Sequence, residues 1–277
     1  MKIKKIFINA IKEKIDKLGF SIVKNNNINF DQNFDISKLN LSEVNIIKNY
    51  NLQKIVTTAG KKLGSIEDPY YYALKESLPL IEKKIFIKSF TNKIKLIIKS
   101  PRTAGEAIGL VESKILSKYP EWALVKPWDD KLIDENYRSY LLKFISKRKK
   151  LKSYHETCET EKKEVIYSDL AWESHAEQFF DLYVSISKNG FQNSNPVPVH
   201  LFKYDNLFKL SLSDDGNHRI RIAYIHGLKS VPLRILKIID LQNMNNWTNV
   251  KNGLYSSDEA KKIFINYFNY TGEGAYV

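Results

Sequence analysis

Residues 214–235 read Asp-Asp-Gly-Asn-His-Arg-Ile-Arg-Ile-Ala-Tyr-Ile-His-Gly-Leu-Lys-Ser-Val-Pro-Leu-Arg-Ile, and this stretch decides how the chain is expected to fold. A predicted strand (208–212) enters a turn at Asp214–Asn217, a helix begins at His218, and a second strand starts at Val231. A glycine turn that leads into a helix leaves several backbone N–H groups without intrahelical acceptors, at the positive pole of the helix dipole. The stretch therefore predicts a phosphate-binding helix start between two strands.

Charged side chains gather at the same turn. His218 and Arg219 add donors to those of the backbone, and an arginine can hold a phosphate through two parallel hydrogen bonds. For both residues, phosphate contact competes with a purely structural role. Asp215 adds a carboxylate that can hold a metal ion or a substrate group, whereas Asp214 suits a simple turn residue.

The order of segments around this turn resembles that of the ParB/sulfiredoxin superfamily over about residues 164–240. The turn Asp215–Arg219 is followed by Ala223, Gly227 and the strand at Val231–Pro232. Upstream lie an entry segment (169–173), a helix (176–188) that contains the sequence Leu-Tyr-Val-Ser-Ile, a capping glycine (Gly190) and a strand (196–199). The resemblance implies that the turn binds nucleotide phosphates through Gly216, Asn217, His218 and Arg219.

Two branches of the superfamily fit the sequence poorly. Sulfiredoxins carry a cysteine directly before the His-Arg pair, where this chain has Asn217, and its single cysteine, Cys158, lies outside the turn. Chromosome-partition ParB proteins carry a downstream helix-turn-helix domain. Here one convincing helix, 257–268, follows Asp240. A DNA-binding module in the N-terminal region remains an alternative.

The turn is most similar to that of the free-serine kinases, which reads Asp-Gly-His-His-Arg, with Asn217 in place of the first histidine. This resemblance implies a kinase that phosphorylates a hydroxyl group of an amino acid, polyol or sugar, using ATP or another nucleotide and Mg²⁺. It assigns Glu173 as the general base, Asp215 to the metal or hydroxyl, and His218 and Arg219 to the phosphates. Such a set suits phosphoryl transfer, which needs a positioned hydroxyl, a carboxylate and cations along the phosphates.

Structural alternatives remain for the residues near this site. Glu173 is equally a candidate for a carboxylate that only caps the following helix, and His175 suits a surface or capping position. Arg221 lies two residues beyond Arg219 and is expected on another helix face. His226 precedes a glycine and suits the helix C-terminus.

The chain carries a formal net charge of +13, which indicates an anionic partner such as a nucleotide, nucleic acid, membrane surface or phosphorylated substrate. The alternative is that this charge only reflects a composition rich in lysine, asparagine and isoleucine. A second functional hypothesis is therefore a non-enzymatic ParB-like nucleotide-binding module that holds nucleic acid or a protein partner. Such a binder has no need of the carboxylates Glu173 and Asp215.

The N-terminal residues 2–18 predict an amphipathic helix with a lysine-rich face. Packing against the protein and peripheral contact with an anionic membrane are the alternatives for it. Its sequence also resembles the opening of many cell-surface polysaccharide biosynthesis enzymes. No apolar run approaches the roughly 20 residues of a membrane span, and no signal peptide is evident. We therefore expect a cytoplasmic protein, with contact at the inner membrane face as an option, and the oligomeric state stays open.

The predicted fold class is α/β (α+β). A mostly helical N-terminal region (1–150) is expected to precede a basic and polar hinge (151–163) and a ParB/sulfiredoxin-like mixed-sheet domain with a short C-terminal helix (164–277). The pattern predicts helices at 41–66, 70–84, 104–117 and 137–145, and a pair of strands, or a strand and a loop, at 84–98. Trp128, beside Asp129, suits either a base- or sugar-stacking platform or an aromatic-pinned connector.

Overall fold

The computed structural model describes residues 25–28, 39, 44–48, 50–58, 60–78, 82–98, 103–139, 169–213 and 215–269. In them a five-stranded mixed sheet has the order β1-β2-β5-β3-β4. Its strands are β1 (Asn25–Ile28), β2 (Val44–Ile47), β3 (Val197–Tyr204), β4 (Leu207–Leu212) and β5 (Leu233–Asp240). β1 runs parallel to β2 and β3 parallel to β5, whereas β2–β5 and β3–β4 are antiparallel. The α/β class of the sequence prediction is confirmed at this level.

The sheet joins segments that are far apart in the sequence. Asn45 of β2 pairs with Ile235 of β5, so the N-terminal region supplies two strands to the sheet that also contains β3 and β4. The predicted amphipathic helix 2–18, the hinge 151–163 and Cys158 lie outside the described residues. The proposed domain boundaries therefore stay predictions.

The elements around the quoted turn follow one another in the predicted order. α7 (Asp169–Asn189) ends at Gly190, which has a φ of 72° and donates its N–H to Ile186 O at 2.9 Å. β3, β4, α8 (Asn217–Ile225) and β5 follow. The C-terminal helix α10 (Ser257–Phe268) has the predicted limits, and a capping box between Ser256 and Glu259 fixes its start.

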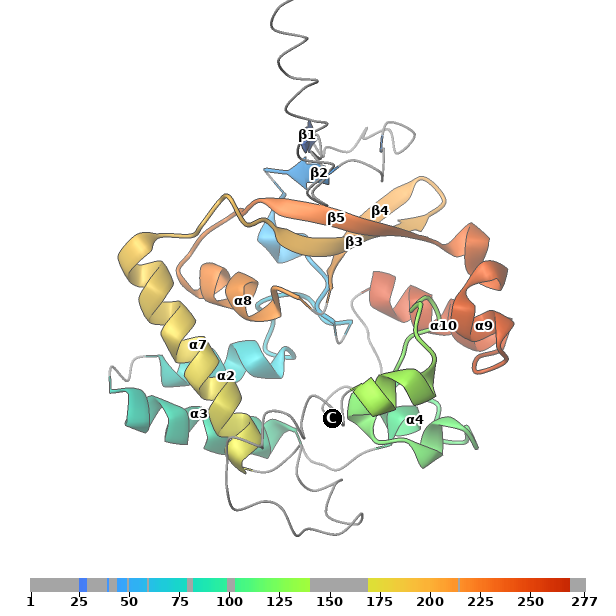
Figure 1. The fold of residues 1–277 in the computed structure, drawn as a ribbon, viewed down its shortest axis with the longest axis horizontal. Helices are drawn as coiled ribbons and strands as arrows, with labels where there is room; N and C mark the ends of the chain where they lie inside the picture. The colour runs from blue at the N-terminus through green and yellow to red at the C-terminus, as the bar shows by residue number, and fades with distance from the viewer. Residues whose placement is uncertain are drawn as a thin grey trace, which may run out of the picture.

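Helices pack beneath the sheet in two groups, with α8 directly under the strands (Figure 1). One group is α7 with α2 (Pro69–Ser77) and α3 (Lys83–Ile97). The other contains α4 (Ala104–Ala107), α9 (Thr248–Lys251), α10 and the 3-10 turns Leu116–Lys118, Glu121–Ala123 and Leu241–Asn246. Each hydrophobic cluster combines residues from before and after the undescribed segment 140–168. Among the described residues, no helix is both long and apolar enough to cross a membrane.

The helix predicted at 41–66 is wrong. The described part of this stretch forms β2, a 3-10 turn at Leu52–Lys54 and loop structure. Several of its apolar residues mimic a helical period, but Ile47, Leu52 and Ile55 are fully enclosed in a cluster with residues of the sheet. Pairing of β2 with β5 overrides the local pattern, as tertiary context commonly does for strands.

The strands predicted at 84–98 are also wrong, because this segment is the helix α3. The misleading signal was the alternation of isoleucines near its start. The residues that the protein buries are Phe86, Phe90 and Ile94, which recur every four residues as a helix requires, whereas Ile85 and Leu96 are exposed.

Two predicted helices begin where expected but end early. Asp68 caps α2, which stops at Ser77, two residues before Pro79. α4 starts with a capping box formed by Thr103 and Glu106, and it ends at Ala107 because Gly109 takes a left-handed φ of 75°. The helix predicted at 137–145 overlaps a helical stretch at 133–139. The residues after 139 lie outside the described part of the chain.

Trp128 is a core residue and not a stacking platform. Its side chain is only 2 % exposed. It lies edge-on to four aromatic rings, Phe202, Trp247, Phe264 and Tyr267, with ring centroids 5.0–6.1 Å away. The connector interpretation is therefore confirmed: Trp128 pins the segment before it to β3 and to the C-terminal helices.

We predict that Trp128→Ala lowers the free energy of unfolding by about 3–5 kcal/mol, since it opens a cavity among these rings. Chemical denaturation followed by far-UV circular dichroism measures the change. Leu207→Ala, at a side chain that is 61 % exposed, is the matched control and should change stability little. A comparable loss in both variants would contradict the core assignment.

Candidate functional site

The N-terminus of α8 is shaped by Gly216. This residue takes the left-handed conformation, with φ 84° and ψ −2°, and the first intrahelical hydrogen bond runs from Ile220 N to Gly216 O at 3.1 Å. A Cβ atom here would lie 2.9 Å from Val197 Cγ1 and 3.2 Å from Pro198 Cδ. Glycine is thus required both by the backbone angle and by the close approach of β3.

Arg219 and Asp215 form the charged side of this turn. Arg219 donates from Nη1 to the carbonyl of Asn195 at 2.7 Å, which holds the guanidinium in place beside the loop that precedes β3. Partial burial lowers the pKa of Arg219, and the negative charge of Asp215 counteracts this by raising it. Asp215 itself is exposed. A partly desolvated cation thus lies next to an exposed carboxylate at the start of a helix.

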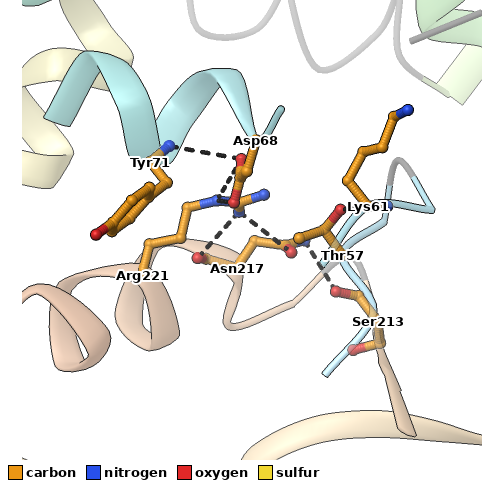
Figure 2. A network of polar contacts seen from close by, with 7 residues as sticks. All are labelled: Thr57, Lys61, Asp68, Tyr71, Ser213, Asn217 and Arg221. Carbon is orange, nitrogen blue, oxygen red and sulfur yellow. Dashed lines mark hydrogen bonds and ion pairs between the residues drawn. The ribbon is translucent and has the colours of Figure 1, made fainter. Parts of the chain in front are cut away.

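Asn217 uses its side chain inside the turn. Its Nδ2 donates to Ser213 O at 2.9 Å, and its Oδ1 accepts from Arg221 Nη1 at 3.4 Å (Figure 2). Ser213 is itself tied down, because its hydroxyl donates to Pro198 O at 3.0 Å. The side chain of Asn217 therefore anchors α8 to the end of β4, and any phosphate contact from this residue would come from its backbone.

A buried ion pair joins α8 to the start of α2. Arg221 Nε donates to both carboxylate oxygens of Asp68, at 2.9 and 3.2 Å, with side chains only 5 % and 1 % exposed (Figure 2). The guanidinium also lies over the Tyr70 ring, 5.2 Å from its centroid, and donates to Asn217 O at 3.2 Å. The expected separation of Arg221 from Arg219 is confirmed, since Arg221 faces the protein interior.

Asp68 has a second role at the start of α2. Its Oδ1 accepts from Tyr71 N at 3.5 Å, so one carboxylate caps α2 and neutralises the arginine of α8. Burial raises the pKa of Tyr71, and the neighbouring Tyr224 and Asp68 raise it further. Beside this network, Thr57 Oγ1 accepts from Lys61 N at 3.2 Å, in a loop joined to β4 by the bond from Leu212 N to Val56 O.

The side chain of His218 lies against α7. Its Nε2 is 3.2 Å from Nδ1 of His175, and the two rings are nearly parallel, 13° apart, with centroids separated by 5.5 Å. Phe179 also packs against His218, with 4.3 Å between the ring centroids. One imidazole donates and the other accepts, so the pair joins the start of α8 to α7. From the sequence we expected His175 at a surface or capping position, so this contact was not predicted.

Glu173 lies elsewhere on α7. It is exposed and belongs to a row with Glu177 and Asp181 at four-residue spacing, and Asp181 accepts from Lys83 Nζ of α3 at 2.9 Å. His175, two residues further on, is displaced by roughly 200° around the helix axis. Within the part of the chain that the structure describes, no hydrogen bond or ion pair joins Glu173 to the turn. The described contacts therefore join His218 of the turn to His175, whereas Glu173 lies on another side of α7.

The described residues contain no cluster of three or more His, Cys, Asp or Glu side chains able to hold a metal ion. This does not conflict with the assignment of Asp215. Mg²⁺ in phosphoryl-transfer sites is usually held by one or two carboxylates together with substrate phosphates and water. The exposed carboxylate of Asp215 beside the start of α8 would fit that arrangement.

The opposite end of α8 has a different character. His226 forms the C-cap, stacks on Tyr183 with centroids 4.7 Å apart, and lies 3.3 Å from the Ser187 hydroxyl, so the predicted C-terminal position is confirmed. A cavity of about 500 Å³ opens near this end, lined by Asn51, Leu52, Gln53, Tyr224, Gly227, Leu228 and Lys229. It contains none of the predicted site residues.

No protein-family model, curated protein or solved structure matches the chain. The similarity to the ParB/sulfiredoxin superfamily accordingly rests on the motif residues and on the order of the elements around them.

The buried pair makes a sharp prediction about stability. Arg221→Met leaves the Asp68 carboxylate buried without its partner, and we expect a loss of about 3–5 kcal/mol in the free energy of unfolding. The double variant Asp68→Asn/Arg221→Met removes the buried charge but keeps a good N-cap residue for α2, so it should recover much of that loss. Denaturant titration of both variants tests this. A double variant less stable than the single one would show that the ion pair is not the source of the effect.

Proposed function

We propose that the chain is a nucleotide-dependent phosphotransferase that moves a phosphoryl group to a hydroxyl of a small metabolite, an amino acid, polyol or sugar. The observation that carries the proposal is the start of α8. There the left-handed Gly216, the partly buried Arg219 and the exposed Asp215 share one helix N-terminus. The donors suit phosphate oxygens, and the carboxylate suits a metal ion or a hydroxyl.

The rigidity of the turn supports this proposal. Asn217, Ser213 and Arg221 connect its backbone to β4 and α2, so the amides at the start of α8 are held in one orientation. Catalysis of phosphoryl transfer consists largely of positioning and electrostatic stabilisation, which a fixed turn provides without reorganisation. Arg219 is itself oriented by the Asn195 carbonyl.

The resemblance to the free-serine kinases also supports the proposal. Asp215, Gly216, His218 and Arg219 match the kinase turn, and α7, Gly190, β3, β4, α8 and β5 follow in the order that the resemblance implies. The nucleotide, ATP or a related one, and Mg²⁺ are part of the same proposal. A cytoplasmic location, where nucleotides are available, fits it.

We assign the chain's own residues as follows. Arg219 and the backbone at the start of α8 bind and orient the phosphates, and Asp215 holds the hydroxyl of the acceptor or the metal ion. Mg²⁺, when bound, would neutralise charge on the transferring phosphoryl group. His175 fixes the ring of His218 and so keeps the start of α8 against α7.

The general base is the point on which geometry and resemblance differ. The resemblance assigns Glu173, whereas in the structure Asp215 is the predicted catalytic carboxylate that stands at the turn. We therefore favour Asp215 as the group that accepts or orients the hydroxyl proton. Glu173 stays a proposal that a single substitution tests.

The second candidate is a nucleotide-binding module without transferase activity, which holds nucleic acid or a protein partner. The exposed position of Glu173, on another side of α7 from His175, favours it, because a binder requires only the phosphate turn. A thermal-shift screen of nucleotides with and without Mg²⁺ comes first, since a ligand of the native state raises apparent stability. A screen of serine, related amino acids, polyols and sugars, scored by nucleotide consumption, then separates the two candidates.

We predict that Arg219→Ala weakens nucleotide binding by roughly 1.5–3 kcal/mol, the usual contribution of a hydrogen bond to a charged group. Titration calorimetry measures it. Arg138→Ala, which removes an equal charge at an exposed position outside the turn, should bind as the wild type does. Equal affinity of wild type and a folded Arg219→Ala variant would refute the phosphate assignment.

We predict that Asp215→Asn lowers turnover by roughly 10²–10⁴-fold, the contribution of a positioned acid or base, with little change in melting temperature. Glu173→Gln should retain turnover close to that of the wild type, because its carboxylate lies on the flank of α7 that carries Asp181. Steady-state rates on the acceptor found in the screen test both. If Glu173→Gln loses rate and Asp215→Asn does not, Glu173 is the general base and Asp215 is not.

A further inference from the structure

The cavity of about 500 Å³ near the C-terminal end of α8 is separate from the turn at its start. It lies between the residues that follow α8 and the 3-10 turn Leu52–Lys54. Tyr224, which lines it, is seven residues beyond Asn217, so roughly 10 Å of helix lies between the cavity and the turn. Arg221, on the same helix face, is occupied by its buried pair with Asp68. The cavity is therefore a second hollow in the protein.

Contacts within the protein hold the walls of this cavity. Leu52 N donates to Lys229 O at 3.1 Å, which joins two of the segments that line it. The ring of Tyr224 lies so close to Gly64 that a Cβ atom on this glycine would be 2.1 Å from Tyr224 Cε1. Tyr224 also makes an edge contact with Tyr71, with 5.5 Å between the ring centroids. Because the lining is held in place before a ligand arrives, binding costs little conformational entropy.

The cavity adjoins the hydrophobic core. Leu52 is fully buried in the cluster that also contains residues of β3 and β5, and Leu228 packs against the same cluster. Gly227 leaves the cavity open, since a Cβ atom at this position would have no other atom within 4 Å. Small-molecule sites are commonly hollows of about 300–1,000 Å³ with an apolar lining and a few polar groups. The size and the leucines suit a small ligand with an apolar body.

The polar groups of the lining favour an anion. Lys229 carries the one charge among the lining residues, which include no Asp or Glu. Within the described part of the chain, no carboxylate pairs with its exposed ammonium group. Gln53 Nε2 lies 3.5 Å from Tyr224 Oη, which is a long hydrogen bond that a better acceptor can replace. An ammonium group and an amide donor at one cavity suit the two oxygens of a carboxylate.

We propose that this cavity binds a small organic carboxylate with an apolar body. Lys229 and Gln53 donate to the carboxylate, and the apolar body lies against Leu52, Leu228 and Tyr224. The ligand is neither the nucleotide nor the phosphoryl acceptor, because the cavity lies at the other end of α8 from Asp215 and Arg219. The proposal therefore does not depend on the phosphotransferase proposal.

Other ligand classes use the lining less completely. A cation would meet the charge of Lys229 without a carboxylate to hold it. A phosphate ester prefers several donors, such as the amides of a helix start, whereas this cavity lies at the opposite end of α8. A neutral apolar molecule would contact the leucines but would gain no charge-assisted hydrogen bond.

The test is an NMR titration of the intact chain with four probes. Benzoate and hexanoate have both an apolar body and a carboxylate, whereas benzyl alcohol lacks the charge and acetate lacks the body. We expect benzoate or hexanoate to bind at least roughly tenfold more tightly than either benzyl alcohol or acetate. The charged hydrogen bonds and the apolar contact are each large enough to give such a difference.

Two variants change the cavity itself. Lys229→Gln should weaken binding of the carboxylate probe roughly tenfold, because it removes the charged donor. Gln53→Trp extends a large ring from the rim of the cavity and should abolish binding. Lys251→Gln and Gln242→Trp make the same changes at exposed positions outside the cavity, and they should bind as the wild type does. Melting temperatures verify that each variant is folded, and Gln53→Phe replaces Gln53→Trp if the latter is not.

Loss of carboxylate binding in both cavity variants and in neither control supports the proposal. The proposal is overturned if neither benzoate nor hexanoate binds saturably, or if a control loses as much affinity as its cavity variant. Benzyl alcohol that binds as tightly as benzoate overturns the choice of a carboxylate. ATP added to the bound probe should leave it in place. Displacement by ATP would assign the cavity to the nucleotide and also overturn the proposal.

Discussion

The buried contact between Asp68 and Arg221 is the constraint on which the arrangement of the candidate site depends. It joins α2 to α8, and through Asn217 it also links them to Ser213 at the end of β4. A buried charge pair contributes little net stability compared with apolar packing, yet it penalises every arrangement in which either partner loses the other. Its main effect here is to favour one position of α8, because few other packings of this helix would give the buried Asp68 carboxylate a partner.

Because of such contacts within the protein, fewer side chains of the turn are available to a ligand than the motif suggests. Of the residues that the sequence assigns to the turn, Asn217 faces Ser213 and Arg221, and His218 faces α7. Arg219 and Asp215 are left as the side chains on the open side. A site with one cation, one carboxylate and a helix start is sufficient to hold phosphates, but its selectivity for an acceptor has to come from residues that the motif does not include.

Local signals predicted the parts of the fold that depend on local physics. Helix α10 and the end of α7 were predicted closely because a capping box and a left-handed glycine mark their limits. β2 and α3 were mistaken for each other's class, because short apolar runs are ambiguous until their packing partners are known. Contacts such as Asp68 with Arg221, 153 residues apart, and His175 with His218 leave no trace in a single sequence. They arise from the three-dimensional arrangement alone.

The pairing of β2 with β5 has a consequence for how the chain is made. Asn45 and its partner Ile235 are separated by 190 residues. At ribosomal rates of about 5–20 residues per second, β2 is synthesised roughly 10–40 s before β5 exists. During that time one side of β2 presents unpaired backbone groups, the kind of edge to which other chains add. Pairing between β2 and β5 must therefore wait until β5 has been synthesised.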